Sequence, residues 1–199
     1  MMKHGKRWNN EKRDRTMKNK AYDVSCYKFC PGEKVLVDTN IWLYLFPAPA
    51  GKPKKFVSTY AAAFAKLVAA DAQPILSPMV LSEYMNRYIR IVWKGSYAKT
   101  YSDFKQFRKS ADFMQIVPSV ECFAKQILQL CRVHELAANS LDLQQALNDF
   151  STGRIDFNDA VLVDICKQYN CKLLTNDSDF QQGGIEILTT HPALLKACA

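Results

Sequence analysis

Short apolar runs alternate with longer stretches of helical period from Glu33 onward. Most of these runs are flanked by Gly, Pro, Asp or Asn, and each is too short to form a helix. The runs expected to be strands are 34–38 (KVLVD), 74–77 (PILS), 114–117 (MQIV), 172–175 (KLLT) and 185–188 (IEIL). Apolar residues three or four positions apart predict helices over 56–68, 81–89, 120–131 and 162–169. The alternation predicts an α/β fold whose central, mainly parallel five-stranded sheet is flanked by helices.

The composition favours a globular protein with a core of its own. The chain has 199 residues, of which 48% are hydrophobic and 23% charged, and this is enough for one domain or two small ones. No apolar run approaches the roughly 20 residues of a membrane span, and no secretory signal follows the start. We therefore expect a cytoplasmic protein without a membrane partner. Its seven scattered cysteines are expected to be free thiols.

The net charge of +8 is concentrated in the first 20 residues, which hold eight Lys or Arg side chains against Glu11 and Asp14. This segment lacks apolar periodicity, so we expect residues 1–32 to form a flexible basic arm and 33–199 to form a single domain. A basic arm suits a polyanion such as RNA, but it suits solubility equally well. A start of translation at Met17 is a further alternative.

Four acidic residues are expected to meet at one edge of the sheet. Asp38 ends the first predicted strand and Asp177 follows the fourth, and ligands bind at the carboxyl ends of parallel strands. Glu83 lies early in the helix after the second strand, and Asp159 begins the helix that leads into the fourth. Carboxylates that converge there raise one another's pKa unless a cation neutralises them. Ligation by oxygen alone favours Mg²⁺ or Mn²⁺ over zinc.

Each of the four acids also has a purely structural explanation. Asp38 is a suitable cap for the helix that follows it, and Glu83 is placed to pair with Arg87 four residues on. Asp159 suits a helix start because the helix dipole favours an acid there, and Asp177 suits a turn. Taken one at a time, these explanations are as good as the functional one.

Three segments carry a resemblance to a known family: VLVDTNIWLYLF, LSEYMNRYI and DFNDAVLVDICKQYNCKLLTNDSDF. They resemble the PIN-domain ribonucleases, among them the VapC-type toxins of toxin–antitoxin pairs, and the likeness runs from about Val35 to Leu188. The resemblance implies a PIN-like fold and a Mg²⁺- or Mn²⁺-dependent endoribonuclease that hydrolyses RNA phosphodiester bonds. It assigns catalysis and metal binding to Asp38, Glu83, Asp159 and Asp177. The occurrence of all four acids in the expected order favours the functional explanation.

Four further polar residues are expected to support these acids. The resemblance gives Asn40 and Thr175 the role of bracing the metal ligands. Asp156 lies one helical turn before Asp159 and is a further supporting candidate. Asp179 is another, and we expect it to cap a helix that begins after it. A metal-activated water attacks phosphorus in such a site, so no protein nucleophile is needed.

The segment between Trp93 and Phe113 is longer than the resemblance leads us to expect, and it is rich in bases and aromatic residues. Its candidate RNA-binding residues are Lys94, Lys99, Lys105, Arg108 and Lys109. Such bases suit phosphate groups, and the aromatic side chains between them suit stacking on nucleotide bases. The commoner structure for this pattern is an amphipathic helix with a solvated basic face and a buried aromatic face.

The expected partners are an RNA substrate and, for a toxin, an antitoxin protein, with a homodimer as a further candidate. The alternative function is a catalytically silent RNA-binding or scaffold protein with a PIN-like fold. The intact acid set argues against it, since silent members are expected to lose acids. A phosphatase on a similar sheet is disfavoured because its DxD pair is absent: Thr39 and Asn40 follow Asp38.

Overall fold

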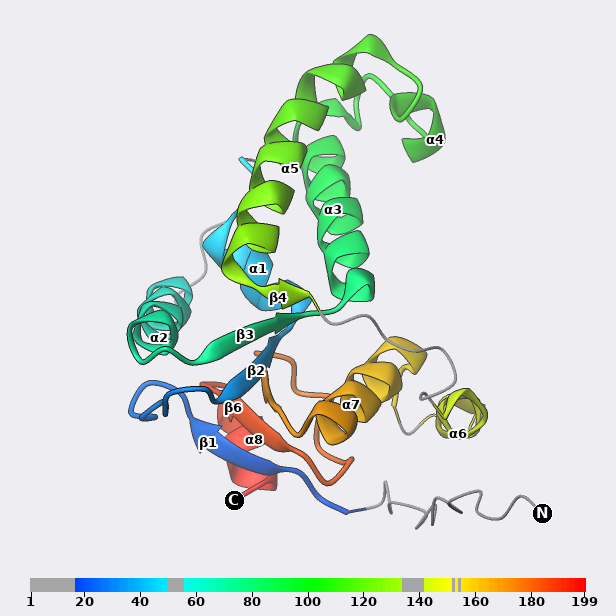
Figure 1. Ribbon diagram of the computed structural model, residues 1–199. Helices are drawn as coiled ribbons and strands as arrows, with labels where there is room; N and C mark the ends of the chain where they lie inside the picture. Colours follow the sequence, from blue (N-terminus) through cyan, green and yellow to red (C-terminus); the bar gives the residue numbers. More distant parts are fainter. Residues whose placement is uncertain (1–16, 50–55, 134–141, 152, 154) are drawn as a thin grey trace, which may run out of the picture.

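The computed structural model describes residues 17–49, 56–133, 142–151, 153 and 155–199. Its centre is a sheet with helices packed against it, and a long helical hairpin rises from one end (Figure 1). The strands are β1 (Lys20–Asp23), β2 (Lys34–Val37), β3 (Gln73–Leu76), β4 (Arg132–Val133), β5 (Lys172–Leu174) and β6 (Glu186–Thr189). They lie in the order β1-β6-β5-β2-β3-β4, and all the pairings are parallel. The α/β fold with a parallel sheet is confirmed, with six strands in the described residues instead of five.

The helices are α1 (Thr39–Leu45), α2 (Val57–Ala69), α3 (Pro78–Val92), the π-helix η1 (Trp93–Tyr97), α4 (Phe104–Phe107), α5 (Ala111–Leu130), α6 (Leu143–Ser151), α7 (Phe157–Tyr169) and α8 (Pro192–Ala197). The four predicted helices correspond to α2, α3, α5 and α7. α1 contacts α2 and α3, and α3 contacts α5, whereas α6 packs on α7 (Figure 1). Right-handed crossovers that run in opposite directions along the sheet place these two groups on opposite faces. None of the described helices is long and apolar enough to cross a bilayer.

The predicted strand 114–117 is wrong, because these residues lie inside α5. Ser110 caps this helix by accepting a hydrogen bond from the Phe113 N–H at 3.2 Å. The helical spacing of buried residues then continues through Val120, Ala124 and Ile127. A short apolar run fits a strand or a helix equally well, and the contacts of the whole helix decided between them. The strand at this point of the fold is β4, which follows α5.

The expected flexible arm is wrong for the residues next to the domain. Residues 20–23 form β1, an edge strand that pairs along its length with β6. The buried Asn19 side chain anchors its start: Nδ2 donates to the carbonyls of Phe180 and Gln182 at 3.1 and 2.9 Å, and Oδ1 accepts the Ile185 N–H at 2.9 Å. The folded unit therefore begins before residue 33. Residues 1–16, which carry most of the basic charge, lie outside the described residues.

The strand order explains where the acids meet. β2 lies between β3 and β5, so the chain leaves β2 in one direction along the sheet and later returns on its other side. Such a reversal opens a crevice at the carboxyl ends of the strands. Residues 35–37 of β2 are fully buried, and Asp38 follows them directly at that edge. The seven cysteines, all within the described residues, are free, as predicted.

Replacing Asn19 tests whether β1 belongs to the folded unit. Asn19→Ala removes three hydrogen bonds and leaves buried backbone groups unpaired, so it should lower the free energy of unfolding by about 2 to 4 kcal/mol. Asp23→Ala is the matched control at the other end of β1, because that side chain makes one exposed hydrogen bond, to the Ser25 N–H. Urea unfolding of both variants measures the difference. Equal, small losses would contradict the placement of β1.

Candidate active site

Asp38 is a buried carboxylate held by three donors. It is 7% exposed and occupies the N-cap position of α1. Its Oδ1 accepts the Thr39 N–H at 2.6 Å, and its Oδ2 accepts the Thr175 hydroxyl at 2.6 Å and the Asn40 side-chain amide. The capping role suggested for Asp38 is therefore real, and Asn40 and Thr175 both contact the acid they were expected to support. A carboxylate oxygen offers two acceptor sites, so Oδ1 retains one for a further ligand.

The loop after β5 brings Asp177 to the same edge. Thr175 Oγ1 accepts the Asp177 N–H at 3.0 Å and the Asn40 amide at 3.1 Å. Asp177 Oδ1 in turn accepts the Asp179 N–H at 3.1 Å. This hydrogen bond closes a local turn, so Asp177 also has the turn role suggested as its structural explanation. One hydroxyl thus links β5 and its loop to Asp38 at the end of β2. The backbone of this loop leaves Asp177 half-buried.

Two residues that fix this loop are absent from the sequence prediction. The Tyr60 hydroxyl of α2 is fully buried, lies 2.8 Å from Asn176 Oδ1 and 3.1 Å from the Thr175 carbonyl, and accepts the Thr190 N–H at 3.0 Å. The Asn176 N–H donates to Asn40 Oδ1 at 3.2 Å. The position of Asn176 between Thr175 and Asp177 is a signal that could have revealed it. Nothing in the sequence distinguishes Tyr60 from the other apolar positions of its helix.

The other two predicted ligands come from helices. Asp159 is half-buried in the first turn of α7, which Asp156 caps by accepting the Asn158 N–H at 2.9 Å. Glu83 lies on α3, where its Oε1 is 3.1 Å from Arg87 Nη1, so the suggested helical ion pair is present. Its side chain is about one-third exposed.

Asp179 does not cap a helix, contrary to expectation. It is exposed in a turn, and the next helix in the described residues, α8, begins only at Pro192. The two glycines that follow, Gly183 and Gly184, both adopt positive φ angles and carry the chain into β6. The chain continues as a turn here, because the residues that directly follow Asp179 do not form helical hydrogen bonds.

Burial and neighbouring acids raise the pKa of Asp38 to about 6. Loss of hydration is the largest cause, and the charges of Glu83 and Asp177 add to it. The hydrogen bonds from Thr175 and from the Thr39 backbone act in the opposite direction, because they stabilise the ionised form. Acids from three separate parts of the chain therefore act on one another at this edge.

Asp159 experiences the strongest effect, with its pKa raised to about 7. Burial is again the main cause. The charges of Asp38, Asp177, Asp156 and Asp179 add to it in that order. The structure thus brings together all four predicted ligands and both of the supporting aspartates within electrostatic range.

The donor chemistry of this cluster suits a hard cation. Every candidate ligand is a carboxylate oxygen, and a cation at this edge would relieve the repulsion that raises the pKa values of Asp38 and Asp159. The spacing is wider than a closed coordination shell, since the described residues hold no three His, Cys, Asp or Glu side chains grouped closely enough for a metal ion. The residues therefore fit Mg²⁺ or Mn²⁺ by chemistry, and binding requires the carboxylates to draw closer.

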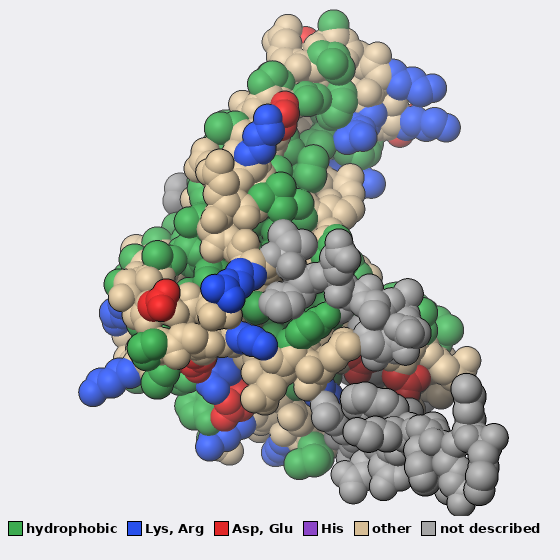
Figure 2. Space-filling model, viewed as in Figure 1, with side chains coloured by type: hydrophobic (Ala, Val, Ile, Leu, Met, Phe, Trp, Pro, Cys, Tyr) green, Lys and Arg blue, Asp and Glu red, His purple; other side chains and the backbone are tan. Residues whose placement is uncertain are grey.

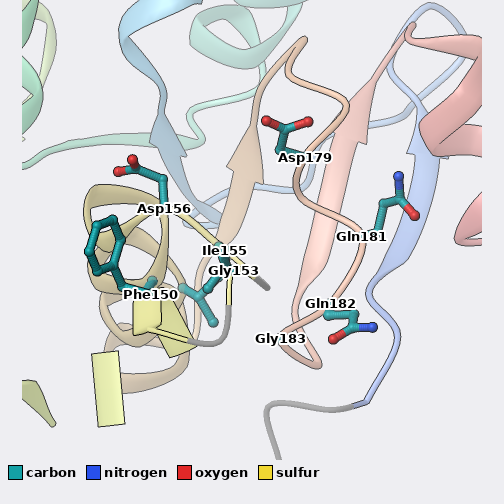
Figure 3. A pocket seen from close by; sticks show the side chains of 10 residues that line it. Phe150, Gly153, Ile155, Asp156, Asp179, Gln181, Gln182 and Gly183 are labelled. Carbon is teal, nitrogen blue, oxygen red and sulfur yellow. The ribbon is translucent and has the colours of Figure 1, made fainter. Parts of the chain in front are cut away.

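A cavity of about 550 Å³ is lined by the two supporting aspartates and by none of the four predicted ligands. Asp156 and Asp179 line it from opposite sides, as Figure 3 shows, with Phe150 and Gln181 further along its walls. A volume of this size is typical of a ligand-binding cleft. Polar and apolar groups are both present, so the cavity can accept a ligand that has an apolar ring and hydrogen-bonding edges.

The predicted RNA-binding bases do not join this cluster. They lie on η1, on α4 and in the adjacent loops, at the far end of the hairpin that α3 and α5 form (Figure 1). The ten residues from Glu83 to Trp93 alone correspond to about 15 Å of helix at ~1.5 Å per residue. Any RNA contact by these bases is therefore separate from the acidic edge.

Comparison with known proteins agrees with the fold. The family model described as "PIN domain" matches residues 35–185, and the chain belongs to the PIN domain family. PIN domains are generally nucleases, which supports nuclease activity here. No curated protein matches the chain.

The chain is similar to two solved structures. One is a chain of VapBC2 from Rickettsia felis, crystallised with a DNA fragment from the promoter, with 16% identity and a TM-score of 0.50 over 78% of this chain and 98% of that one. The other is PAE2754 from Pyrobaculum aerophilum, with 15% identity and a TM-score of 0.41 over 78% of this chain and 90% of that one. At these identities, the first similarity concerns the fold alone.

The raised pKa values predict how stability depends on pH without metal. Asp38 and Asp159 bind protons more tightly in the folded protein than in the unfolded chain, where their pKa is near 3.8. The folded state therefore holds more protons between about pH 4 and pH 7, and the free energy of unfolding should fall across this interval as pH rises, by several kcal/mol at about 1.4 kcal/mol for each unit by which a pKa is raised.

Urea unfolding in EDTA at a series of pH values measures this slope. Asp159→Asn should flatten most of the fall, because the amide does not ionise. Glu121→Gln is the control, since Glu121 is exposed on α5 and pairs with Lys125. Stability that rises between pH 4 and pH 7 in the native chain would contradict the convergence of these acids.

Proposed function

We propose that the protein is a metal-dependent ribonuclease that hydrolyses RNA phosphodiester bonds as an endonuclease. The observation that carries this proposal is the convergence of acids on Asp159: burial, together with the charges of Asp38 at the end of β2, of Asp177 and Asp179 in the loop after β5 and of the neighbouring Asp156, raises its pKa to about 7. Four carboxylates at the carboxyl edge of a parallel sheet are costly to the fold without a bound cation. Membership of a family of nucleases agrees with this explanation.

The proposed metal ligands are Asp38, Glu83, Asp159 and Asp177. When bound, Mg²⁺ or Mn²⁺ supplies a Lewis acid that activates water for attack on phosphorus and stabilises the leaving oxygen. Thr175 and Asn40 hold Asp38 Oδ2, so the remaining acceptor site of Oδ1 has a fixed direction.

The remaining groups of the site orient the substrate and the ligands. Tyr60 and Asn176 hold the loop that carries Asp177. Because the loop is already held at this edge, only a small movement is needed for the acids to draw closer. Asp156 and Asp179 line the cavity and add negative charge that favours cation binding. To bind the cation, Glu83 must break its ion pair with Arg87. Arg87 is then free to approach a phosphate.

We further propose that the protein is the toxin of a toxin–antitoxin pair, held inactive by an antitoxin protein. The support is the similarity in fold to a chain of the VapBC2 complex, which was crystallised with promoter DNA. A short reading frame next to this one would be the natural source of the antitoxin. Co-expression of that product should protect cells from growth arrest by the native chain and should make no difference to the Asp177→Asn variant.

A second candidate function is an RNA-binding or scaffold protein without catalysis. Two observations favour it: the ion pair between Glu83 and Arg87, and the wide spacing of the acids in the described residues. An ion pair of this exposed kind contributes only about 0 to 1 kcal/mol, so a cation can displace it. The two functions are separated by cleavage and by metal binding.

Loss of either of two acids should abolish cleavage. Asp159→Asn and Asp177→Asn each remove a proposed ligand, and we expect RNA cleavage with Mn²⁺ to fall on the order of 100-fold or more. Both variants should fold with unchanged or slightly higher stability without metal, because one of several repelling charges is gone. Cleavage of a labelled RNA and thermal melts measure the two effects.

Glu121→Gln again serves as the matched control, because it removes an exposed carboxylate far from the sheet edge and should cleave like the native chain. Native-level cleavage by Asp177→Asn would exclude the shared site. A native chain that binds RNA but does not cleave it would favour the silent alternative.

Metal binding should appear as a stabilisation of the folded protein. Millimolar Mn²⁺ against a Kd of order 0.1 mM adds roughly 1.4 kcal/mol to the free energy of unfolding, and so a few degrees to the Tm. EDTA should reverse the shift, and acidification toward pH 4 should abolish it because protons compete for the same oxygens. Differential scanning calorimetry measures these shifts.

The Asp159→Asn variant should lose most of the response to Mn²⁺. A larger response to zinc that survives this substitution would instead indicate Cys26 and Cys30, which are exposed and free. Cleavage that persists in EDTA, without any metal-induced shift, would contradict the mechanism proposed above.

A further inference from the structure

The hairpin tip, which we define as residues 93–110, lies between the far ends of α3 and α5. It comprises η1, α4 and the turns that join them. In the view of Figure 1 the tip stands well away from the sheet, with α4 on the same side of the molecule as α6 and α7. The α3 helix connects it to the acidic edge, because α3 begins directly after β3 and carries Glu83.

The aromatic side chains of the tip pack on one another. Phe107 is fully buried, and its ring lies 5.1 Å from that of Tyr97, 5.7 Å from that of Tyr101 and 6.0 Å from that of Phe113, between centroids. The indole of Trp93 donates to the Tyr101 carbonyl at 3.0 Å. The tip therefore has a small core of its own, and its rings are occupied by one another. Phe107 has the buried aromatic position expected of an amphipathic helix, and the rings of Trp93, Tyr97, Tyr101 and Phe104 are half-buried.

The bases of the tip, in contrast, project into solvent, and Figure 2 shows them gathered around the end of the hairpin. The exposed ones are Arg90 at its border and Lys94, Lys99, Lys105, Arg108 and Lys109 within it. None of them forms an ion pair with an acid of the described residues.

The geometry of the tip holds this charge in place. The guanidinium of Arg90 lies 4.2 Å from the centre of the Phe104 ring, and that of Arg108 lies 4.5 Å from the centre of the Phe113 ring. Asp103 accepts the Lys105 N–H as the cap of α4, and Asp112 accepts the Tyr101 hydroxyl at 2.8 Å. Against these two acids stand the six bases, so the tip and its border keep a net charge of +4.

We propose that the hairpin tip is a second RNA-binding surface. It binds phosphates of the substrate strand at a distance from the acidic edge, and it does not recognise the nucleotide sequence. The proposal rests on RNA being the substrate. Exposed bases without acidic partners bind phosphates by releasing counterions, and this binding is independent of sequence. Because the aromatic rings of the tip pack on one another, its charge is the feature that it offers most openly to a nucleic acid.

RNA fits this surface better than an acidic protein does. A protein interface needs an apolar centre. Among the described residues, the large apolar side chain that is exposed beside the tip is Met114, on the first turn of α5, and one such side chain does not make an apolar centre. A flexible strand that occupies the acidic edge can reach the tip along α3, which spans about 22 Å at ~1.5 Å per residue. The tip would therefore lower the KM for long RNA.

The test compares two variants that each lose four positive charges. The tip variant carries Lys94→Gln, Lys99→Gln, Lys105→Gln and Lys109→Gln, and the control carries Lys28→Gln, Lys66→Gln, Lys125→Gln and Lys196→Gln. All eight side chains are exposed. The probes are fluorescein-labelled oligouridine and oligoadenosine of about 20 nucleotides, titrated in EDTA between about 50 and 200 mM salt.

The tip variant should bind both RNAs at least tenfold more weakly, and its slope of log affinity against log salt should be shallower by about 2 to 3, at ~0.7 per lost phosphate contact. The control should keep most of the native slope. Equal losses in the two variants, or an unchanged slope in the tip variant, would overturn the proposal. So would a native preference for one RNA that disappears in the tip variant.

Polyglutamate of the same length distinguishes an acidic protein as the occupant. Competition as strong as that of unlabelled RNA would overturn the assignment to RNA. Since binding is measured in EDTA, it does not depend on cleavage. Tip-dependent binding by a chain that fails to cleave RNA would support this surface and count only against the proposed ribonuclease.

Discussion

The burial of one carboxylate, that of Asp38, determines how the edge of the sheet is built. An acid that is 7% exposed stays compatible with the fold only if hydrogen bonds replace the water that it loses. Thr39 and Asn40 follow Asp38 directly in α1, whereas Thr175 comes from the end of β5, so the Thr175 hydrogen bond forms only when β2 and β5 pair in register. The same hydrogen bonds that stabilise the sheet edge therefore aim the acid.

The other acids add a cost that the fold does not remove. Burial and mutual repulsion leave the pKa of Asp159 near 7, although a fold selected for stability alone would place a neutral side chain there. Tyr60 bridges α2 to the ends of β5 and β6 and keeps the loop of Asp177 close to this charge. The repulsion is thus built into a rigid frame, which is the arrangement expected where a cation binds during function.

The hairpin tip separates positive charge from the acidic edge. Its aromatic residues fold the tip, and this leaves its bases exposed and unpaired. The acidic edge and the basic tip carry opposite charges, and one helix, α3, joins them. In the proposal made for the tip, its positive charge would hold RNA near a site whose own negative charge repels phosphates.

The amino-acid sequence by itself determined two kinds of element. The first kind has a long run of helical period, and its members are helices α2, α3, α5 and α7. The second kind is a short, strongly apolar run, and its members are strands β2, β3, β5 and β6. It also indicated the four acids as candidate ligands, through their places near strand ends and in the early turns of helices and through the resemblance to a known family. Only the tertiary structure decided that residues 114–117 are helical, that residues 20–23 complete the sheet, and that Tyr60 and Asn176 hold the site. The physical reason is that a four-residue run has little conformational preference of its own, and a hydrogen bond between residues 116 positions apart leaves no local pattern.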